Sequence, residues 1–390
     1  MKSEWKTIRA ADFMEFNPRM NLKKGTIATK ISMDKLQPYT KKIPETEQAE
    51  FSGGTKFSNG DTIMARITPC LENGKTAFID CLNKDEVAFG STEFIVLRAK
   101  PGVSDAQFVY YLATSPEFRQ VAIKSMVGSS GRQRVQQPVL ENLELVVPEL
   151  PEQKRIGGFL AAIDDKIALN AKINDNLLEQ MQALYKSWFV DYRPFGGVMP
   201  TSWTRTGIYS LANIIYGAPF ASKQFNTEGN GKPIIRIRDL KDQQFATYTT
   251  EVHPKGYLLH PGDIVVGMDG EFRPYIWGND EAWLNQRVCV LENKRPNGKA
   301  FLYFTIKPLL FAIEQTQVAT TVIHIGKKDF DAFEIMLPDT ELLDAFDAIT
   351  TPMVEQIVSN SIENKRLAIM RDALLPKLMS GEIDVSDIQL

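Results

Sequence analysis

The sequence has few of the residues on which disulfide-stapled folds, zinc sites and histidine-based catalysts depend. Its 390 residues include three cysteines, Cys70, Cys81 and Cys289, and three histidines, His253, His260 and His324. An odd number of cysteines without a Cys-x-x-Cys pair argues against a disulfide framework and a structural zinc site. Three histidines outside any recognisable nucleophile elbow leave little room for a Ser/His/Asp catalytic group.

Long apolar runs are also missing. No stretch of 18 apolar residues occurs, so we expect no membrane-spanning helix. The first twenty residues carry charges spread from Lys2 to Arg19 and hold no apolar core of a signal peptide. With the low cysteine content, these features predict a protein of the reducing cytoplasm.

Catalytic motifs are absent as well. Gly74-Lys75-Thr76 resembles the end of a phosphate-binding loop, but Pro69 stands where the first glycine of that loop belongs. No Gly-x-Gly-x-x-Gly follows a predicted strand, and no Asp/Asn-Pro-Pro-aromatic motif of an amino-methyltransferase is present. Pro338-Asp339 followed by Glu363-Asn364-Lys365 has the outline of a metal nuclease site, but the later residues belong to a helical repeat. The chain therefore reads as a binding protein.

What is present is the composition of an ordinary globular protein with two to four domains: 43% hydrophobic, 24% charged and 10% aromatic residues. The formal net charge is −3. Residues 1–150 carry +2, residues 196–338 carry +1, and residues 339–390 carry −6. A polyanionic partner would need local basic loops, because the overall field is weak.

The chain contains an internal duplication. Residues 135–189 and 322–379 share a layout: a β-type run ending in a proline, at Pro148 or Pro338, is followed by a long helical pattern. The helical patterns match at an offset of 190, and upstream matches fall at 198 and 202, as loop insertions would produce. A period this long excludes a solenoid and indicates a two-part unit written twice.

The helical patterns carry heptad seams. In residues 152–190, apolar or special residues recur in alternating steps of four and three, which is typical of a coiled coil. A helix of that length would run about 58 Å at 1.5 Å per residue. The second helix repeats the pattern, but Pro352 predicts a break or bend, with the regular part beginning there.

Paired asparagines predict how the two helices pack. Asn170 and Asn174 lie symmetrically about the middle of the first seam, and Asn360 and Asn364 about the middle of the second. In an antiparallel pair, residues whose numbers sum to 534 face each other, so Asn170 meets Asn364 and Asn174 meets Asn360. Buried asparagines cost stability unless they pair, and pairing fixes the register. The alternative is that each asparagine faces solvent. The residues expected to pair the helices are Ile156, Ile163, Ile167, Asn170, Asn174, Leu177, Leu184, Trp188, Ile357, Asn360, Asn364, Leu367, Leu374 and Leu378.

Each globular block mixes short strands with helices, which predicts an α+β fold. In the first block, strands are expected at 62–67, 76–79 and 93–98, and helices at 106–114 and 116–124. In the second block, strands are expected at 233–238, 263–267 and 286–292, and a helix at 300–315. The whole is then two α+β domains separated by two long helices packed as an antiparallel coiled coil.

Several loops are rich in residues that contact nucleic acid. The segment from Gly128 to Arg134 combines backbone donors, hydroxyls and guanidinium groups, and Arg and Gln make bidentate bonds to guanine and adenine edges. A solvated Gly/Ser loop, a polar strand face or a plain turn are the ordinary alternatives. The candidate DNA-binding residues are Arg66, Lys75, Ser129, Ser130, Arg132, Gln133, Arg134, Tyr216, Lys232, Arg236, Arg238, Arg273, Gln286, Arg287, Thr320 and Thr321.

Several motifs together resemble the specificity subunit of type I restriction-modification systems. The helix carries Leu150-Pro151-Glu152-Gln153-Lys154-Arg155-Ile156 and closes with Leu184-Tyr185-Lys186-Ser187-Trp188-Phe189-Val190-Asp191. The second half adds Gly231-Lys232-Pro233-Ile234-Ile235-Arg236-Ile237-Arg238-Asp239-Leu240 and ends with Leu374-Leu375-Pro376-Lys377-Leu378-Met379-Ser380-Gly381. The likeness covers essentially the whole chain, although the second helix has Pro338-Asp339-Thr340-Glu341 in place of the Pro-Glu-Gln start.

The resemblance implies two target-recognition domains, at 1–150 and 193–338, spacer helices at 151–192 and 339–380, and a tail at 381–390. It implies that double-stranded DNA is read as a bipartite target with a non-specific gap. It also implies two methyltransferase subunits that carry S-adenosylmethionine, and optionally a translocating nuclease subunit that uses ATP and Mg. On this reading the chain has no cofactor, metal or catalysis of its own.

Two competing hypotheses remain at this stage. An enzyme in its own right would show a metal- or cofactor-dependent activity with the purified chain alone. A coiled-coil adaptor that binds only proteins would lack DNA affinity that falls with rising salt.

Overall fold

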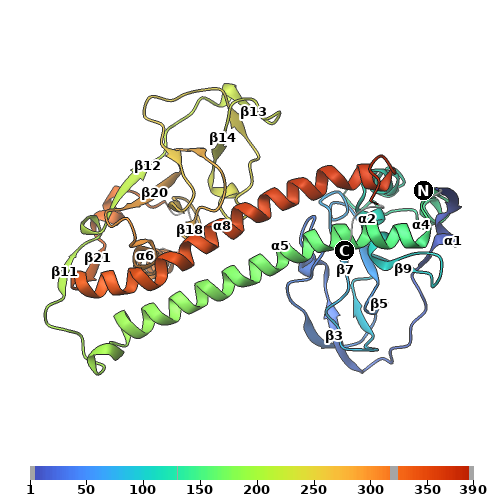
Figure 1. Ribbon diagram of the computed structural model, residues 1–390, viewed down its shortest axis with the longest axis horizontal. Helices are drawn as coiled ribbons and strands as arrows, with labels where there is room; N and C mark the ends of the chain where they lie inside the picture. Colours follow the sequence, from blue (N-terminus) through green and yellow to red (C-terminus); the bar gives the residue numbers. More distant parts are fainter. Residues whose placement is uncertain (1–4, 130, 317–323, 386–390) are drawn as a thin grey trace. The chain divides into compact units, whose positions relative to one another are not determined.

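The computed structural model describes residues 5–129, 131–316 and 324–385 (Figure 1). The chain divides into two compact units: unit 1 comprises residues 1–168 and 367–390, and unit 2 comprises residues 169–366. Within the described residues, none of the helices combines the length and apolarity that a membrane crossing requires.

Unit 1 contains two four-stranded sheets and a separate strand pair. The first sheet has the order β2-β9-β6-β7 and is antiparallel throughout, with bounds Met14–Phe16, Phe94–Ala99, Thr62–Ala65 and Thr76–Phe78. The second has the order β4-β3-β8-β5, with bounds Glu47–Glu50, Ile27–Ile31, Ala88–Gly90 and Thr55–Phe57, and its β3 and β8 run parallel. Strand β1 (Lys6–Arg9) pairs antiparallel with β10 (Glu144–Val147).

Helices pack beside the first sheet of unit 1. They are α1 (Ala10–Phe13), α2 (Ala106–Thr114), α3 (Pro116–Lys124) and α4 (Gln137–Glu141). Helices α2 and α3 have the predicted bounds, because each begins at a side-chain cap: Asp105 accepts from the Phe108 N–H and Ser115 from the Phe118 N–H. Phe108, Tyr111 and Phe118 are buried between these helices and the sheet.

Unit 2 repeats this plan. Its first sheet is β12-β20-β17-β18, with bounds Ala212–Tyr216, Val288–Asn293, Ile264–Gly267 and Pro274–Ile276. Its second is β13-β15-β14-β19-β16, with bounds Phe225–Asn226, Tyr248–Thr249, Lys232–Ile235, Ala282–Leu284 and Leu258–Leu259, and again holds one parallel pair, β14 with β19. Strand β11 (Thr204–Gly207) pairs with β21 (Glu334–Leu337), and the helices are α6 (Lys299–Thr316) and α7 (Lys327–Asp331). The predicted α+β duplication is confirmed.

One predicted strand is wrong in its second half. Strand β14 ends at Ile235, and residues Ile237–Asp239 form a 3₁₀ turn. The Asp239 carboxylate accepts a hydrogen bond of 3.0 Å from the Arg236 N–H, so that group is not available to a strand ladder. Arg236 and Arg238 therefore lie at a turn and not on a strand face. The other predicted strands are found with ends shifted by one to two residues.

The prediction that Pro352 breaks the second long helix is also wrong. Helix α8 runs without interruption from Thr340 to Met379. Proline removes one backbone donor, but Leu343, Phe346 and Val354 on both sides of it are buried in the core of unit 2. This packing keeps the helix continuous through the proline. The first long helix, α5, spans Leu150–Tyr185 and continues into a π-helical turn at Lys186–Val190.

The α5 and α8 segments lie side by side and antiparallel within each unit (Figure 1). In unit 2, Asn170 donates to Asn364 and Asn360 donates to Asn174, both at 2.9 Å, and the rings of Trp188 and Phe346 are 5.9 Å apart. Asn170 is 1% exposed and Asn360 is 4% exposed, so the solvent-facing alternative is wrong. The predicted antiparallel register is confirmed there.

In unit 1 the same seam is closed by apolar residues and an ion pair. Ile156, Leu160 and Leu378 share one buried cluster, and Arg371 contacts Asp164 at 2.5 Å. The remaining seam positions are partly or fully buried: Ile163, Ile167, Leu177, Leu184, Ile357, Leu367 and Leu374.

Candidate nucleic-acid interface

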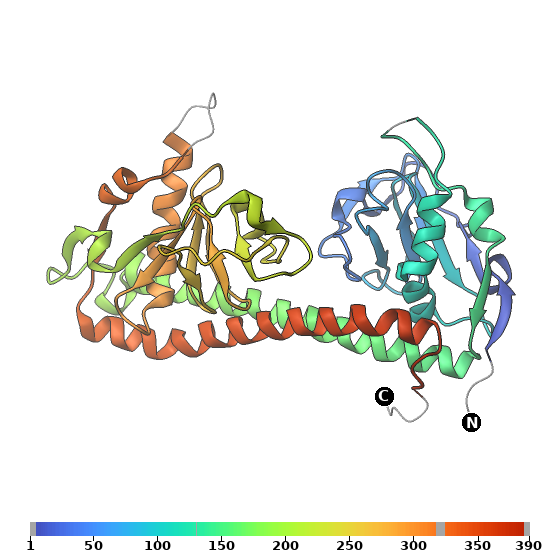
Figure 2. The ribbon, with the colours of Figure 1, turned by 90° about the horizontal axis from the view of Figure 1, so that it is seen from above.

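Three loops of unit 1 are joined by backbone hydrogen bonds. The Arg66 N–H donates to the Glu93 carbonyl at 2.9 Å, the Val135 N–H to the Arg66 carbonyl at 2.9 Å, and the Thr68 N–H to the Gln133 carbonyl at 3.0 Å. We call residues 66–68, 93, 127–129 and 131–135 cluster 1. Its described residues between α3 and α4 lie on the side of unit 1 opposite to α5 (Figure 2).

Unit 2 contains the same arrangement. The Met268 N–H donates to the Arg287 carbonyl and the Ile325 N–H to the Met268 carbonyl, both at 2.9 Å. These are the first two bonds of cluster 1 repeated, with Met268, Arg287 and Ile325 in the places of Arg66, Glu93 and Val135. We call residues 268–269, 286–287 and 324–325 cluster 2. The backbone frame is therefore shared, whereas the side chains on it differ.

Cluster 1 holds three arginines and one carboxylate, and Arg134 is paired with that carboxylate, Glu93. Arg134 contacts Glu93 through Nε at 3.0 Å and Nη2 at 2.7 Å. This bond holds the pKa of Glu93 below its usual range and raises the pKa of Arg134. Arg66 is half-buried, with Nη2 directed to the Val135 carbonyl at 3.4 Å. Arg132, Gln133 and Ser129 are exposed, and the Arg132 side chain has no partner among the residues that the structure describes.

Cluster 2 is organised around Asp269. Its Oδ1 lies 2.6 Å from His324 Nδ1 and 3.5 Å from Arg287 Nη1. A carboxylate can only accept, so His324 Nδ1 carries the hydrogen and Arg287 is attracted to the carboxylate rather than to the imidazole. Gln286 is exposed beside Arg287.

Six other candidates lie outside the two clusters, and most have internal partners. Lys75 donates to the Met33 carbonyl at 2.9 Å, and Lys232 pairs with Glu281 at 2.9 Å. Arg236 bonds Thr247, and Arg238 lies 3.5 Å from Asp239. Arg273 pairs with Glu314. Tyr216 packs against Phe330, and burial raises its pKa. The predicted residues Ser130, Thr320 and Thr321 lie outside the described residues.

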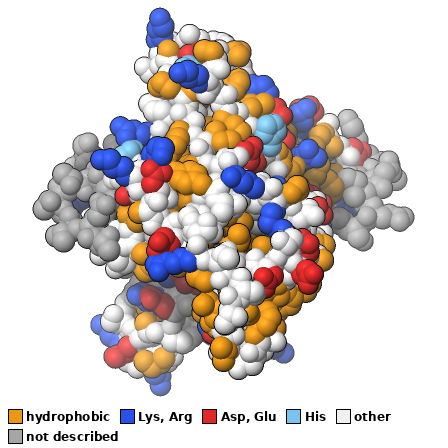
Figure 3. All heavy atoms as spheres, turned by 90° about the vertical axis from the view of Figure 1, so that its left-hand side faces the viewer, with side chains coloured by type: hydrophobic (Ala, Val, Ile, Leu, Met, Phe, Trp, Pro, Cys, Tyr) orange, Lys and Arg blue, Asp and Glu red, His pale blue; other side chains and the backbone are white. Residues whose placement is uncertain are grey.

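On one face of unit 2, charged side chains of both signs are mixed with apolar and uncharged ones (Figure 3). The face of unit 2 turned to the viewer in Figure 3 shows Lys and Arg side chains interspersed with Asp and Glu. Binding to a polyanion through such a surface depends on a few placed cations and not on a general field.

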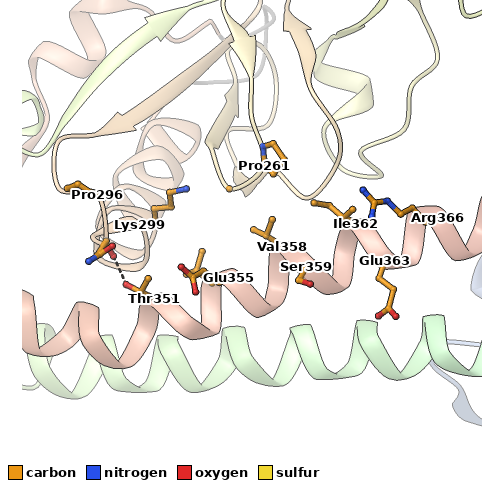
Figure 4. A pocket seen from close by; sticks show the side chains of 13 residues that line it. Pro261, Pro296, Lys299, Thr351, Glu355, Val358, Ser359, Ile362, Glu363 and Arg366 are labelled. Carbon is orange, nitrogen blue, oxygen red and sulfur yellow. Dashed lines mark hydrogen bonds between the residues drawn. The ribbon is translucent and has the colours of Figure 1, made fainter.

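A hollow of about 650 Å³ lies elsewhere in unit 2 (Figure 4). Pro261, Pro296 and Lys299 line one side of it, and the α8 residues Val354, Val358 and Ile362 line the other. None of the candidate DNA-binding residues lines this hollow. Among the described residues, no group of three or more His, Cys, Asp or Glu side chains could hold a metal ion.

Sequence reasoning missed Glu93, Asp269 and His324. A weak signal existed for His324 alone, because position 134 falls on it at the offset of 190 that relates the long helices. Glu93 lies 41 residues before Arg134, and nothing in the sequence pairs the two.

Comparisons with known proteins agree with this architecture. The family model described as Type I restriction modification DNA specificity domain matches residues 2–179 and again residues 200–363. The Type I restriction enzyme HindI specificity subunit of Haemophilus influenzae is 24% identical over 414 residues, covering 84% of this chain and 87% of that protein.

Two further similar proteins match different shares of the chain. The Type I restriction enzyme EcoBI specificity subunit of Escherichia coli is 38% identical over 138 residues, which covers 35% of this chain and 29% of that protein. The crystal structure of a Type-I restriction-modification system S subunit from M. genitalium shares the fold, with a TM-score of 0.56, 16% identity and 96% of each chain covered.

Proposed function

This chain belongs to the type I restriction-modification DNA specificity family, and from that premise we propose that each of its units reads one half of a bipartite DNA target separated by a non-specific gap. The chain is a DNA-recognition subunit and not an enzyme. The observation that carries the proposal is the double match of the family model, once on each repeat, with one loop cluster in each repeat.

We assign target recognition to residues 1–150 and 193–338. The helical segments 151–192 and 339–380 then serve as the spacer, and 381–390 as a tail. Two half-site readers on one face of a duplex sit about one helical turn, roughly 34–36 Å, apart. A helix pair with its register fixed by buried asparagines is suited to set such a gap, so added residues in both helices should lengthen it.

The partners we propose are two methyltransferase subunits and, optionally, restriction subunits that translocate DNA. The cofactors then belong to the partners: S-adenosylmethionine to the methyltransferases, and ATP with Mg to the nuclease. Val354, Val358 and Ile362 form an apolar row at i, i+4 and i+8 on α8 beside the hollow of unit 2. This row lies in the part of the chain, residues 339–390, that carries a net charge of −6, and it suits a docking helix better than DNA.

The test is a genome-wide map of methylated adenines in the host with and without this gene. A gapped bipartite motif that disappears on deletion is the expected result. An unchanged map would contradict the proposal, unless the complex is silent in the host. Binding of the purified complex to DNA at two salt concentrations separates these cases, because a DNA reader loses affinity as salt rises and a protein adaptor has none to lose.

A further inference from the structure

The two clusters carry opposite charges on one backbone frame. Directly before strand β9, unit 1 has Glu93, and directly before the equivalent strand β20, unit 2 has Arg287. Shortly before helix α4, unit 1 has Arg134, and shortly before the equivalent helix α7, unit 2 has His324. The frame bonds are 2.9 Å in both units, so the fold accepts either a carboxylate or a guanidinium at the place of Glu93 and Arg287. Folding therefore does not dictate the charge at this place.

In each cluster a carboxylate lies inside and a guanidinium lies outside. The side chains of Glu93 and Asp269 are each 24% exposed, whereas those of Arg134 and Arg287 are 44% and 54% exposed. The carboxylates come from different loops than the arginines they hold. An exposed arginine anchored by a less exposed carboxylate loses little rotamer freedom when it binds.

Each guanidinium keeps unused donors. Glu93 occupies Nε and Nη2 of Arg134, which leaves the Nη1 hydrogens and one Nη2 hydrogen. Asp269 faces Nη1 of Arg287, which leaves the Nε and Nη2 edge. In both cases two parallel N–H groups remain, and that fork matches O6 and N7 of guanine in the major groove.

We propose that Arg134 and Arg287 are the guanine-reading residues of the two units, and that Glu93 and Asp269 are their positioning residues. Because the arginine stands at a different place on the shared frame in each unit, the two units address guanines at different positions of their half-sites. This inference rests on the proposed function and names the specificity determinants within it.

The experiment uses the full chain assembled with its methyltransferase partners. The complex selects from duplex libraries in which one half-site at a time is randomised, and the bound sequences give a base preference at every position. A wild-type complex without a bipartite preference would overturn the proposed function and this inference with it.

With the wild-type preference established, Arg287→Ala should remove the preference for guanine at one position of one half-site, and Arg134→Ala at one position of the other. The loss of affinity for the intact site should be roughly 5- to 150-fold, because one bidentate contact is removed. An unchanged preference would overturn the inference, and so would equal weakening on specific and random DNA, which marks a phosphate contact.

The positioning role is tested by reversing the pair. Glu93→Arg with Arg134→Glu retains an ion pair, and unit 2 shows that the frame accepts arginine at this place. A purely structural pair would tolerate the reversal and keep the wild-type preference, which would overturn the inference; we expect the guanine preference of that half-site to be lost. Glu93→Gln should broaden the preference, and Glu93→Asp should restore part of it. The matched control reverses the exposed pair Arg9 and Asp12, 3.0 Å apart outside the cluster, and should leave both half-sites unchanged.

Discussion

The two units hold the same helix pair by different chemistry. In unit 1, Arg371 of α8 reaches Asp164 of α5 at 2.5 Å, with the side chains 12% and 5% exposed. At the offset of 190, unit 2 has Met181 in the place of Arg371 and Val354 in the place of Asp164, both in its apolar core. Helix pairing at this level therefore does not require charge.

A buried ion pair adds little net stability over apolar residues that pack equally well, but it penalises any register that separates its members. Asp164 also accepts a hydrogen bond from the Tyr111 hydroxyl, which ties α2 to the same point. We infer that a buried ion pair fixes the helix register in unit 1, whereas buried asparagine amides fix it in unit 2.

The largest expected effect on stability comes from removing the arginine of the buried ion pair between Asp164 and Arg371. Arg371→Met leaves Asp164 buried without its cation and should cost unit 1 about 3–5 kcal/mol. Hydrogen exchange of the α5 amides in residues 150–168, measured at rising urea, reports this loss.

The matching variant copies unit 2. Asp164→Val with Arg371→Met and Tyr111→Phe removes the three hydrogen-bonded side chains together and should be clearly more stable than Arg371→Met alone, because none of the three is left buried without its partner. A triple variant as unstable as Arg371→Met alone would show that unit 1 needs the charges themselves.

The next effect concerns the proline of α8. Pro352 is exposed, and the residue at the same place in α5 is Ala162. Pro352→Ala restores an N–H to a helix that is already continuous. It should stabilise unit 2 by about 2 kcal/mol, once the greater freedom of the unfolded chain is subtracted. Slower hydrogen exchange around residues 348–352 is the expected observation, and faster exchange would mean that the proline ring packs against a needed neighbour.

A smaller effect is expected at the asparagines. Asn360→Leu removes the donor to Asn174 Oδ1 and should cost unit 2 about 1–3 kcal/mol. Tryptophan fluorescence follows unit 2, because four of the five tryptophans lie in it: Trp188, Trp203, Trp277 and Trp283.

Replacing both asparagines of the pair Asn174 and Asn360 tests whether they fix the register of the two helices. Asn174→Leu with Asn360→Leu should recover most of the stability and loosen the register. Cysteines at Leu177 and Ile357, which face each other in the native register, should then crosslink less completely. Undiminished crosslinking would show that the apolar seam alone fixes the alignment.

The smallest effect belongs to the pair Glu93 and Arg134. As an exposed pair it should contribute little to stability, because solvent screens it. The pKa of Glu93 is lowered by Arg134, so the contribution is present above the usual carboxyl range and disappears as the pH falls through the lower pKa of the folded state. Glu93→Gln should abolish this dependence in an acid titration of stability, and a loss confined to neutral pH would contradict the assignment.

Much of the architecture could be read from the sequence because its signals are local or periodic. Helices α2 and α3 have the predicted bounds, and in the structure each begins at a side-chain cap, Asp105 or Ser115. Once an antiparallel pair is assumed, the spacing of the asparagines defines its register, since only one antiparallel alignment pairs all four.

What could not be read depends on loops that meet in space. Pro352 failed as a helix breaker because burial on both sides outweighs the loss of one donor. The strand after Pro233 failed because one carboxylate, Asp239, captures a ladder donor. The candidate residues were chosen by type alone, so the list contained Arg134 and Arg287 but missed the carboxylates that hold them.

The division of the chain has a consequence for the order of its synthesis. Unit 2 is one continuous stretch, residues 169–366, and all of its partners are available when Arg366 leaves the ribosome. Unit 1 is split around unit 2. About two hundred further residues must therefore be synthesised before Arg371 can pair with Asp164 and before Leu378 can pack against Ile156 and Leu160. Synthesis of unit 1 therefore begins before that of unit 2, but unit 1 can complete its fold only after unit 2 has been synthesised.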